Sequence, residues 1–121
     1  MEEFPELFKR SIRLECGPGW HQLIRRICDA IKPLVIANGL HDFEVVQIKE
    51  KFGALRFYVH NGNDEIYTII DRHESDSIYI CEECGAVENV HCRNSGWIRH
   101  LCDKCFKQPK EVIRLDEDPL C

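Results

Sequence analysis

The sequence predicts an α+β protein in which a helix–β-hairpin–helix layer is followed by a small cysteine-rich module at the C-terminal end. Three observations predict this class. Apolar residues recur at spacings of three and four from Trp20 to Val35, apolar and polar residues alternate from Phe43 to His60, and two Cys-x-x-Cys pairs follow residue 80. A chain of 121 residues is long enough for one compact domain and an appended module.

The first helix is expected over the amphipathic stretch from Trp20 to Val35. Pro33 lacks a backbone donor and should kink or interrupt its last turn, and Gly39 provides a stop. Residues 4 to 14 have a weaker helical period, and we expect a short helix there as well.

A β-hairpin is predicted from residue 43 to residue 60, with a tight turn at Phe52-Gly53 because glycine accepts a positive φ. Alternation then places an apolar set of side chains toward the core and a polar set on the other face. The expected pairs are Ile48 with Leu55 and Val46 with Phe57 on the core face, and Lys49 with Arg56 and Gln47 with Tyr58 on the polar face.

A second helix should begin near Asn63 or Asp64, either of which can cap it, and run to about Ser77. Its inner stripe would contain Ile66, Ile69, Ile70 and His73. Residues 63 to 80 hold five acidic residues and one arginine. Charge is therefore segregated between a basic hairpin face and an acidic helix.

The strongest signal for a site is the pair of Cys-x-x-Cys motifs, Cys81 with Cys84 and Cys102 with Cys105. Four thiolates at this spacing form the closed tetrahedral shell of a structural zinc ion. We therefore divide the chain into an α+β domain at 1–80, a zinc module at 81–115 packed on it, and a short acidic tail at 116–121.

Other cysteines and histidines leave alternatives open. His91 and Cys92 lie between the two motifs and are candidates to replace a ligand, or to form a second site with Cys16 or Cys121. Cys28 falls within the apolar helical stripe and is expected to be a buried thiol.

The segment between the motifs is expected to form a hairpin from residues 86–90 and 97–101, turned at 93–96, and residues 106–115 to form a helix. A Cys-x-x-Cys pair, a hairpin and a second pair at a helix start resemble the treble-clef class of zinc finger. This resemblance covers residues 81–115 and concerns the fold, not the function.

Several motifs together resemble a group of small uncharacterised proteins from bacteriophages and prophage regions. They are the Cys-Gly-Pro-Gly-Trp stretch at 16–20, the Lys-Glu-Lys-Phe-Gly stretch at 49–53, the Leu-Arg-Phe-Tyr-Val strand at 55–59, the first cysteine pair at 81–85 and the Gly-Trp-Ile-Arg-His-Leu-Cys-Asp stretch at 96–103. The resemblance spans residues 12–106 and implies a phage setting, which favours inhibition of a host protein or defence complex, or regulation on DNA.

Enzymatic activity is not expected. A treble-clef nuclease of the His-Asn-His type is the less favoured alternative, because His91 follows Val90 where those enzymes often have Asp, and the expected last helix has neither His nor Asn. The chain has no phosphate-binding loop of the Gly-Lys-Ser/Thr kind.

The expected function is binding. The proposed contact residues are Lys49, Lys51, Arg56 and Tyr58 on the hairpin and Arg93, Trp97 and Arg99 in the zinc module. The formal net charge of -5 favours an acidic protein partner over nucleic acid, although a regulator that binds nucleic acid remains the alternative. Two further options are a solvated face with intramolecular ion pairs and pairing of two copies of the chain.

A cytoplasmic location is expected. No apolar run approaches the ~20 residues that cross a bilayer, and the N-terminus is acidic and lacks the order of a secretory signal. Reducing conditions would keep the cysteines available for metal.

Overall fold

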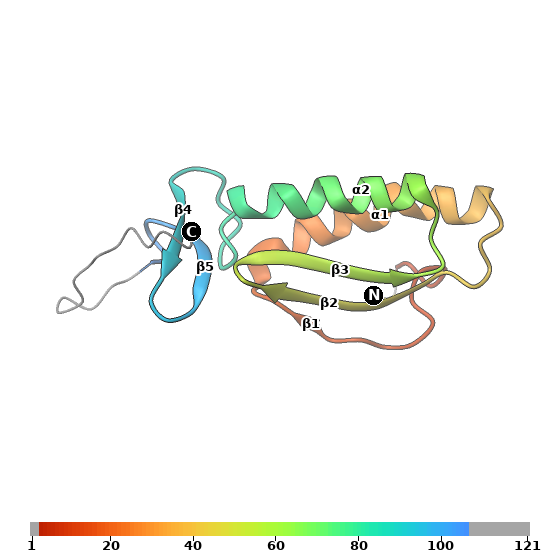
Figure 1. Ribbon diagram of the computed structural model, residues 1–121, viewed down its shortest axis with the longest axis horizontal. Coiled ribbons are helices and arrows are strands. Elements are labelled where there is room, and N and C mark those ends of the chain that lie inside the picture. Colours follow the sequence, from red (N-terminus) through yellow and green to blue (C-terminus); the bar gives the residue numbers. More distant parts are fainter. Residues whose placement is uncertain (1–2, 107–121) are drawn as a thin grey trace.

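The computed structural model describes residues 3–106 and contains two helices on one face of a small sheet, with a second sheet beyond one end of this layer (Figure 1). The helices are α1 (His21–Ala37) and α2 (Asp64–Asp76), and the strands are β1 (Leu14–Glu15), β2 (Glu44–Lys51), β3 (Ala54–His60), β4 (Val90–Asn94) and β5 (Ile98–Cys102). Short 3-10 helices, η1 (Pro18–Trp20) and η2 (Ser77–Tyr79), precede α1 and follow α2. The predicted mixed α and β architecture is confirmed.

The first helix forms where the apolar period predicted it, but Pro33 does not interrupt it. The helix continues through Pro33 to Ala37 and ends at Asn38 and Gly39, the latter with φ of 61°. The Asn38 side chain donates to the Leu34 carbonyl oxygen at 2.8 Å, which satisfies a backbone acceptor of the last turn.

The predicted helix over residues 4–14 is wrong. Residues 3–13 form turns, bends and irregular backbone, and Leu14–Glu15 forms β1, which pairs in parallel with β2. Phe4 and Leu7 are buried in the core, and the Leu7 carbonyl oxygen accepts a hydrogen bond from the Val45 amide at 2.8 Å. Contacts with β2 and α1 therefore outweigh the weak local preference for helix.

The hairpin has the predicted turn, with φ of 84° at Gly53, and the predicted pairing of Lys49 with Arg56. The predicted apolar pairs are wrong, because Ile48 lies opposite Phe57. Pairing Lys49 with Arg56 sets the register of this antiparallel ladder, so Ile48 lies opposite Phe57 and Leu55 lies opposite Glu50. A bulge between Val45 and Gln47 removes Val46 from the ladder, an irregularity that alternation alone does not reveal.

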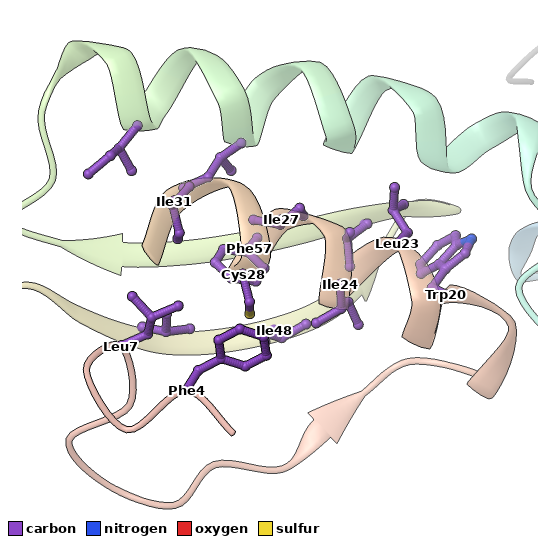
Figure 2. Packing of buried hydrophobic residues seen from close by; sticks show 14 of the residues in the cluster. Phe4, Leu7, Trp20, Leu23, Ile24, Ile27, Cys28, Ile31, Ile48 and Phe57 are labelled. Atoms are coloured by element: carbon purple, nitrogen blue, oxygen red, sulfur yellow. The ribbon is translucent and has the colours of Figure 1, made fainter. Parts of the chain in front are cut away.

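The main core lies between the helices and the sheet. Figure 2 shows apolar side chains of α1, among them Ile24, Ile27 and Ile31, packed against Ile48 and Phe57 of the sheet. Phe4 and Leu7 close the core on the side of β2. Because the helices cover only one face, the other face of β2 and β3 has no layer packed on it within the described residues (Figure 1).

The second helix also protects the outer edge of β3. Asn63 caps α2 as predicted, accepting a hydrogen bond from the Ile66 amide at 3.0 Å. Farther along, the Glu74 carboxylate accepts from the Phe57 amide at 2.7 Å, and the Ser77 hydroxyl accepts from the Leu55 amide at 3.0 Å. These side chains take the place of a neighbouring strand and block edge-to-edge association along β3.

Among residues 3–106, neither α1 nor α2 combines the length and the apolar character that a bilayer-spanning helix needs.

Glu74 makes stability depend on pH in a defined direction. Burial raises the pKa of its carboxyl above the ordinary 4.5, and the Phe57 amide and the charge of Arg56 offset only part of this rise. The folded state thus binds the proton of Glu74 more tightly than the unfolded state does. This proton's contribution to the free energy of unfolding is complete below the unfolded-state pKa and is lost as pH rises through the folded-state pKa.

We therefore expect Glu74→Gln, which keeps an acceptor oxygen for Phe57, to gain stability relative to the wild type as pH rises above 4.5. Urea unfolding midpoints of both proteins across a pH series measure this difference. Glu65→Gln, on the exposed side of α2, is the matched control. A difference between the wild type and the Glu74→Gln protein that stays constant with pH would contradict the assignment.

Candidate metal centre

The four predicted ligand sulfurs come together. The Sγ atoms of Cys81, Cys84, Cys102 and Cys105 all lie within 4.8 Å of one another. Cys81 and Cys84 belong to the turn after η2, whereas Cys102 ends β5 and Cys105 follows in the next turn. This is the one group of three or more metal-ligating side chains found among residues 3–106, and it is able to hold a metal ion.

The spacing of the sulfurs fits a tetrahedral metal ion. Zinc–sulfur bonds of about 2.3 Å in a tetrahedral shell place the sulfurs about 3.8 Å apart. The Sγ atoms of Cys84 and Cys102, which come from different motifs, are 3.7 Å apart. The site is therefore close to the dimensions that four thiolate bonds require.

Backbone hydrogen bonds hold each cysteine pair in a tight turn. The Gly85 amide donates to the Cys81 carbonyl oxygen at 2.9 Å, with Gly85 at φ of 84°, and the Phe106 amide donates to the Cys102 carbonyl oxygen at 3.0 Å. The two turns are thus alike in hydrogen bonding. Each points its two sulfurs toward the same point, as a metal site requires.

The thiols would not ionise together without a cation. Burial raises the pKa of Cys81, but backbone amides of Cys102, Cys84 and Glu83 donate to its sulfur and bring the pKa to about 7. Burial, hydrogen bonds with the other thiols and the charge on Cys81 raise the pKa of Cys105 to about 12. One thiolate forms readily and opposes the next, so a divalent cation is needed to balance several of them.

The strands around the centre are shifted from their predicted bounds. The hairpin was expected at residues 86–90 and 97–101, but β4 is Val90–Asn94 and β5 is Ile98–Cys102. The ladder pairs Val90 with Cys102, which places a ligand inside the sheet. The predicted helix at 106–115 extends beyond the described residues.

A glycine-containing loop from the start of the chain packs against the first cysteine pair. The Gly19 amide donates to the Glu82 carbonyl oxygen at 2.6 Å, and the Gly17 amide donates to Glu82 Oε2 at 2.8 Å. A Cβ atom at Gly19 would lie 2.6 Å from the Glu82 carbonyl carbon, so the close approach requires glycine. Trp20, fully buried, donates from Nε1 to the Ile80 carbonyl oxygen at 3.0 Å.

Glu82 carries a buried charge in the middle of this contact. The residue is 3 % exposed, and its second oxygen, Oε1, accepts from Arg99 Nε at 3.2 Å. Arg99 also donates to Glu83 at 2.7 Å. Glu82 therefore joins the loop, the first cysteine pair and β5 through one carboxylate, and removing it would leave donors without partners.

The turn of the large hairpin makes a second contact with the metal module. Nδ1 of His100 donates to the Gly53 carbonyl oxygen at 2.7 Å. A Cβ atom at Gly53 would lie 2.9 Å from Cγ2 of Ile98, so a larger residue would push β5 away. We call the contacts made by Gly17–Trp20 and Gly53 with 80–85 and 98–100 the junction. The role of Glu82 was not predicted from the sequence, and the only sequence signal for the junction was the glycine-rich loop.

The predicted partner-binding residues occupy different environments. Arg93 bonds to Asp103 at 2.7 Å and Arg99 bonds to Glu82 and Glu83, so both guanidinium groups are engaged within the metal module. Trp97 stays 59 % exposed.

On the hairpin, Arg56 reaches the outer edge of β3, where its Nη1 donates to the Leu55 carbonyl oxygen at 3.2 Å and its charge acts on Glu74. Tyr58 is 38 % exposed on the uncovered face. Within residues 3–106, neither Lys49 nor Lys51 forms an ion pair.

The other candidate ligands lie apart from the centre. His91 has a 60 % exposed side chain 4.0 Å from the Asp103 carboxylate, and neither it nor Cys92 joins the cysteine cluster within the described part of the chain. Burial raises the pKa of Cys16 to about 11 and that of Cys28 to about 12, so both thiols are poor nucleophiles and poor ligands at neutral pH. Cys121 lies outside the described residues.

Comparisons of the chain with models of protein families, with curated proteins and with solved structures found no match.

Loss of one ligand should disrupt the module far more than loss of a core thiol. We expect Cys102→Ser to abolish stoichiometric metal binding and to unfold at least β4 and β5, since metal binding stabilises so small a unit. Cys28→Ala, the control, should keep the metal and cost about 1–2 kcal/mol. Metal content per chain and amide hydrogen exchange measure both effects. Retention of metal by the Cys102→Ser protein would refute the ligand set.

Gly19→Ala tests the junction. We expect it to destabilise the protein by about 3 kcal/mol, because the added methyl group would collide with backbone atoms of Glu82. The control is Gly62→Ala, whose methyl group would meet only the Tyr67 and Ile66 side chains, the nearest atom 3.3 Å away, and should cost less than about 1 kcal/mol. Chemical denaturation of the metal-loaded proteins gives both values. Equal costs would show that the loop does not need its close approach.

Proposed function

We propose that this chain is a non-enzymatic, zinc-stabilised binding protein that acts on a protein partner with an acidic surface. The observation that carries the proposal is the uncovered face of the sheet, which presents Lys49, Lys51 and Tyr58 without internal ion pairs among the described residues. The metal centre supports this surface from a distance, through the junction.

Zinc is the metal that the donor set favours. Four sulfur ligands in a closed tetrahedral shell suit zinc and leave no position for a reacting water molecule. The centre would then have a structural role. We also propose that the module belongs to the treble-clef class, since a hairpin lies between its cysteine pairs. The helix that this class requires was predicted at 106–115, a range that extends beyond the described residues.

The hairpin face carries less uncompensated positive charge than the sequence predicted, because an internal acid offsets part of it. Lys49 and Arg56 are directly opposed, and like charges in this position are destabilising by roughly 0.2–1 kcal/mol. Arg56 relieves the repulsion by lying near Glu74, as the expectation of intramolecular compensation anticipated. Lys49 lies opposite Glu15 of β1 in the parallel ladder, but among the described residues the two form no ion pair, and Glu15 accepts a hydrogen bond from Gln47 at 3.2 Å. The lysines therefore remain the best contact candidates.

A protein partner fits this surface better than nucleic acid does. Affinity for nucleic acid comes mainly from neutralising several phosphates, and two free lysines on a chain of net charge -5 supply little of it. Lysines beside an exposed tyrosine match an acidic protein surface with an aromatic contact at its centre. The resemblance to phage proteins makes an inhibitor or adaptor of a host protein or defence complex the proposed biological role.

The metal assignment predicts close to one zinc per chain in protein purified without chelator. Elemental analysis by mass spectrometry measures it. A strong chelator should then unfold at least the module, which loss of near-ultraviolet circular dichroism would report. Finding iron in the purified protein, or finding no metal, would refute the assignment of zinc to this site.

Charge reversal tests the binding face. We expect Lys49→Glu/Lys51→Glu to lose the specific partners that immobilised, metal-loaded wild type recovers from a bacterial lysate, because two attractive contacts become repulsive. Arg26→Glu/Arg72→Glu, on exposed sites of α1 and α2, changes charge equally and should keep those partners. If the two double variants recover the same partners, the assignment of binding to this face is wrong.

Binding to labelled double-stranded DNA, single-stranded DNA and RNA tests the alternative of a nucleic-acid-binding regulator. Fluorescence anisotropy across a salt series should show no micromolar binding. Tight binding that falls steeply with salt and disappears in Lys49→Glu/Lys51→Glu would instead identify a nucleic-acid-binding regulator.

A further inference from the structure

Phe52 has an unfavourable backbone conformation and little contact with the rest of the molecule. It lies at φ of 53°, in the left-handed region, and is 73 % exposed at the tip of the β2–β3 hairpin. The other non-glycine residues with positive φ among the described residues, Asn61 and Asn89, are of a type that tolerates this region. A bulky aromatic residue at this position does not serve the stability of the turn.

Asparagine or glycine at position 52 would suit the turn better, so the aromatic ring calls for an explanation outside the monomer. Lys51 places its ammonium group 5.9 Å from the ring centre, so the tip combines an exposed aromatic surface with a positive charge. Strain together with exposure of this kind points to a contact residue.

A shallow groove with the complementary character lies on the same protomer. It is formed where β3 begins and α2 ends, and its apolar surface comes from Ala54, Ile78 and Tyr79, the last 66 % exposed. Asp71 and Asp76 contribute negative charge. Arg56 and Glu74 also line it and compensate each other, which leaves the groove with net negative charge.

We propose that two copies of this chain associate, with Phe52 of each copy against the apolar part of the other copy's groove and Lys51 facing its aspartates. A second copy of the chain is the favoured occupant of the groove, because its aromatic tip matches the apolar part of the groove and its Lys51 matches the aspartates.

The arrangement closes on itself. The groove begins at Ala54, two residues after Phe52, so tip and groove are neighbours at the same end of the sheet. A two-fold axis between them therefore forms both contacts at once and gives a closed dimer instead of an open chain. The inference goes beyond the proposed function, although the two surfaces share Lys51. Phe52→Asn distinguishes them, because it removes the dimer contact and leaves Lys49, Lys51 and Tyr58 in place for a partner.

Sedimentation velocity of the metal-loaded full chain, from micromolar to millimolar concentration, tests the proposal. We expect a monomer–dimer equilibrium whose dissociation constant rises at least about tenfold in Phe52→Asn. The control Val87→Asn, at an apolar residue that is 71 % exposed, should leave the equilibrium unchanged. At concentrations where both proteins are monomeric, Phe52→Asn should unfold at an equal or higher temperature, because asparagine accepts the left-handed conformation.

Charge exchange provides a second readout. Lys51→Glu and Asp76→Lys should each weaken the dimer, and combining them in one chain should restore it, because each contact then joins opposite charges again. A protein that is monomeric at millimolar concentration overturns the proposal. So does a dimer that Phe52→Asn leaves unchanged, or a double variant no better than the two single ones.

Discussion

The carboxylate of Glu82 is buried where the metal centre meets the sheet, and it holds three parts of the chain together. One oxygen accepts from Gly17, at the entrance to α1, and the other accepts from Arg99 of β5, while the backbone of Glu82 belongs to the first cysteine turn. A buried carboxylate is tolerable only when such donors surround it. The position of the metal centre relative to the helical layer follows from this requirement.

The junction explains why the most distinctive motifs are glycine-rich. Gly19 and Gly53 lie far apart in sequence, yet each brings its backbone against the metal module so closely that a side chain would collide. Gly85 restricts the first cysteine turn for a different reason: its φ of 84° lies in the left-handed region, while a Cβ atom there would make only a tight contact, 3.2 Å from the Gly19 carbonyl oxygen. Metal binding, loop conformation and hairpin orientation are thus mutually dependent.

The same architecture leaves the proposed binding surface on the opposite side of the sheet from the helices. Because α1 and α2 cover one face of the sheet and α2 also blocks the edge of β3 through Glu74 and Ser77, the uncovered face and the hairpin tip are the parts of this sheet left open to a partner. Arg93 and Arg99, which the sequence analysis proposed as contact residues of the zinc module, form ion pairs within that module. The sequence alone does not show whether a charged residue forms an ion pair within the chain or contacts a partner.

Local patterns in the sequence were enough to determine α1, α2, the β2–β3 hairpin with its Gly53 turn, and the four cysteines that meet at one point. Each depends on spacing along a short stretch: apolar period, alternation, capping, and two residues between thiols. The tertiary structure alone decided that residues 4–14 become a core-filling segment and a parallel strand, that a bulge displaces Val46, and that Glu82 joins the two parts. These features arise from contacts between residues tens of positions apart, and no local period records such contacts.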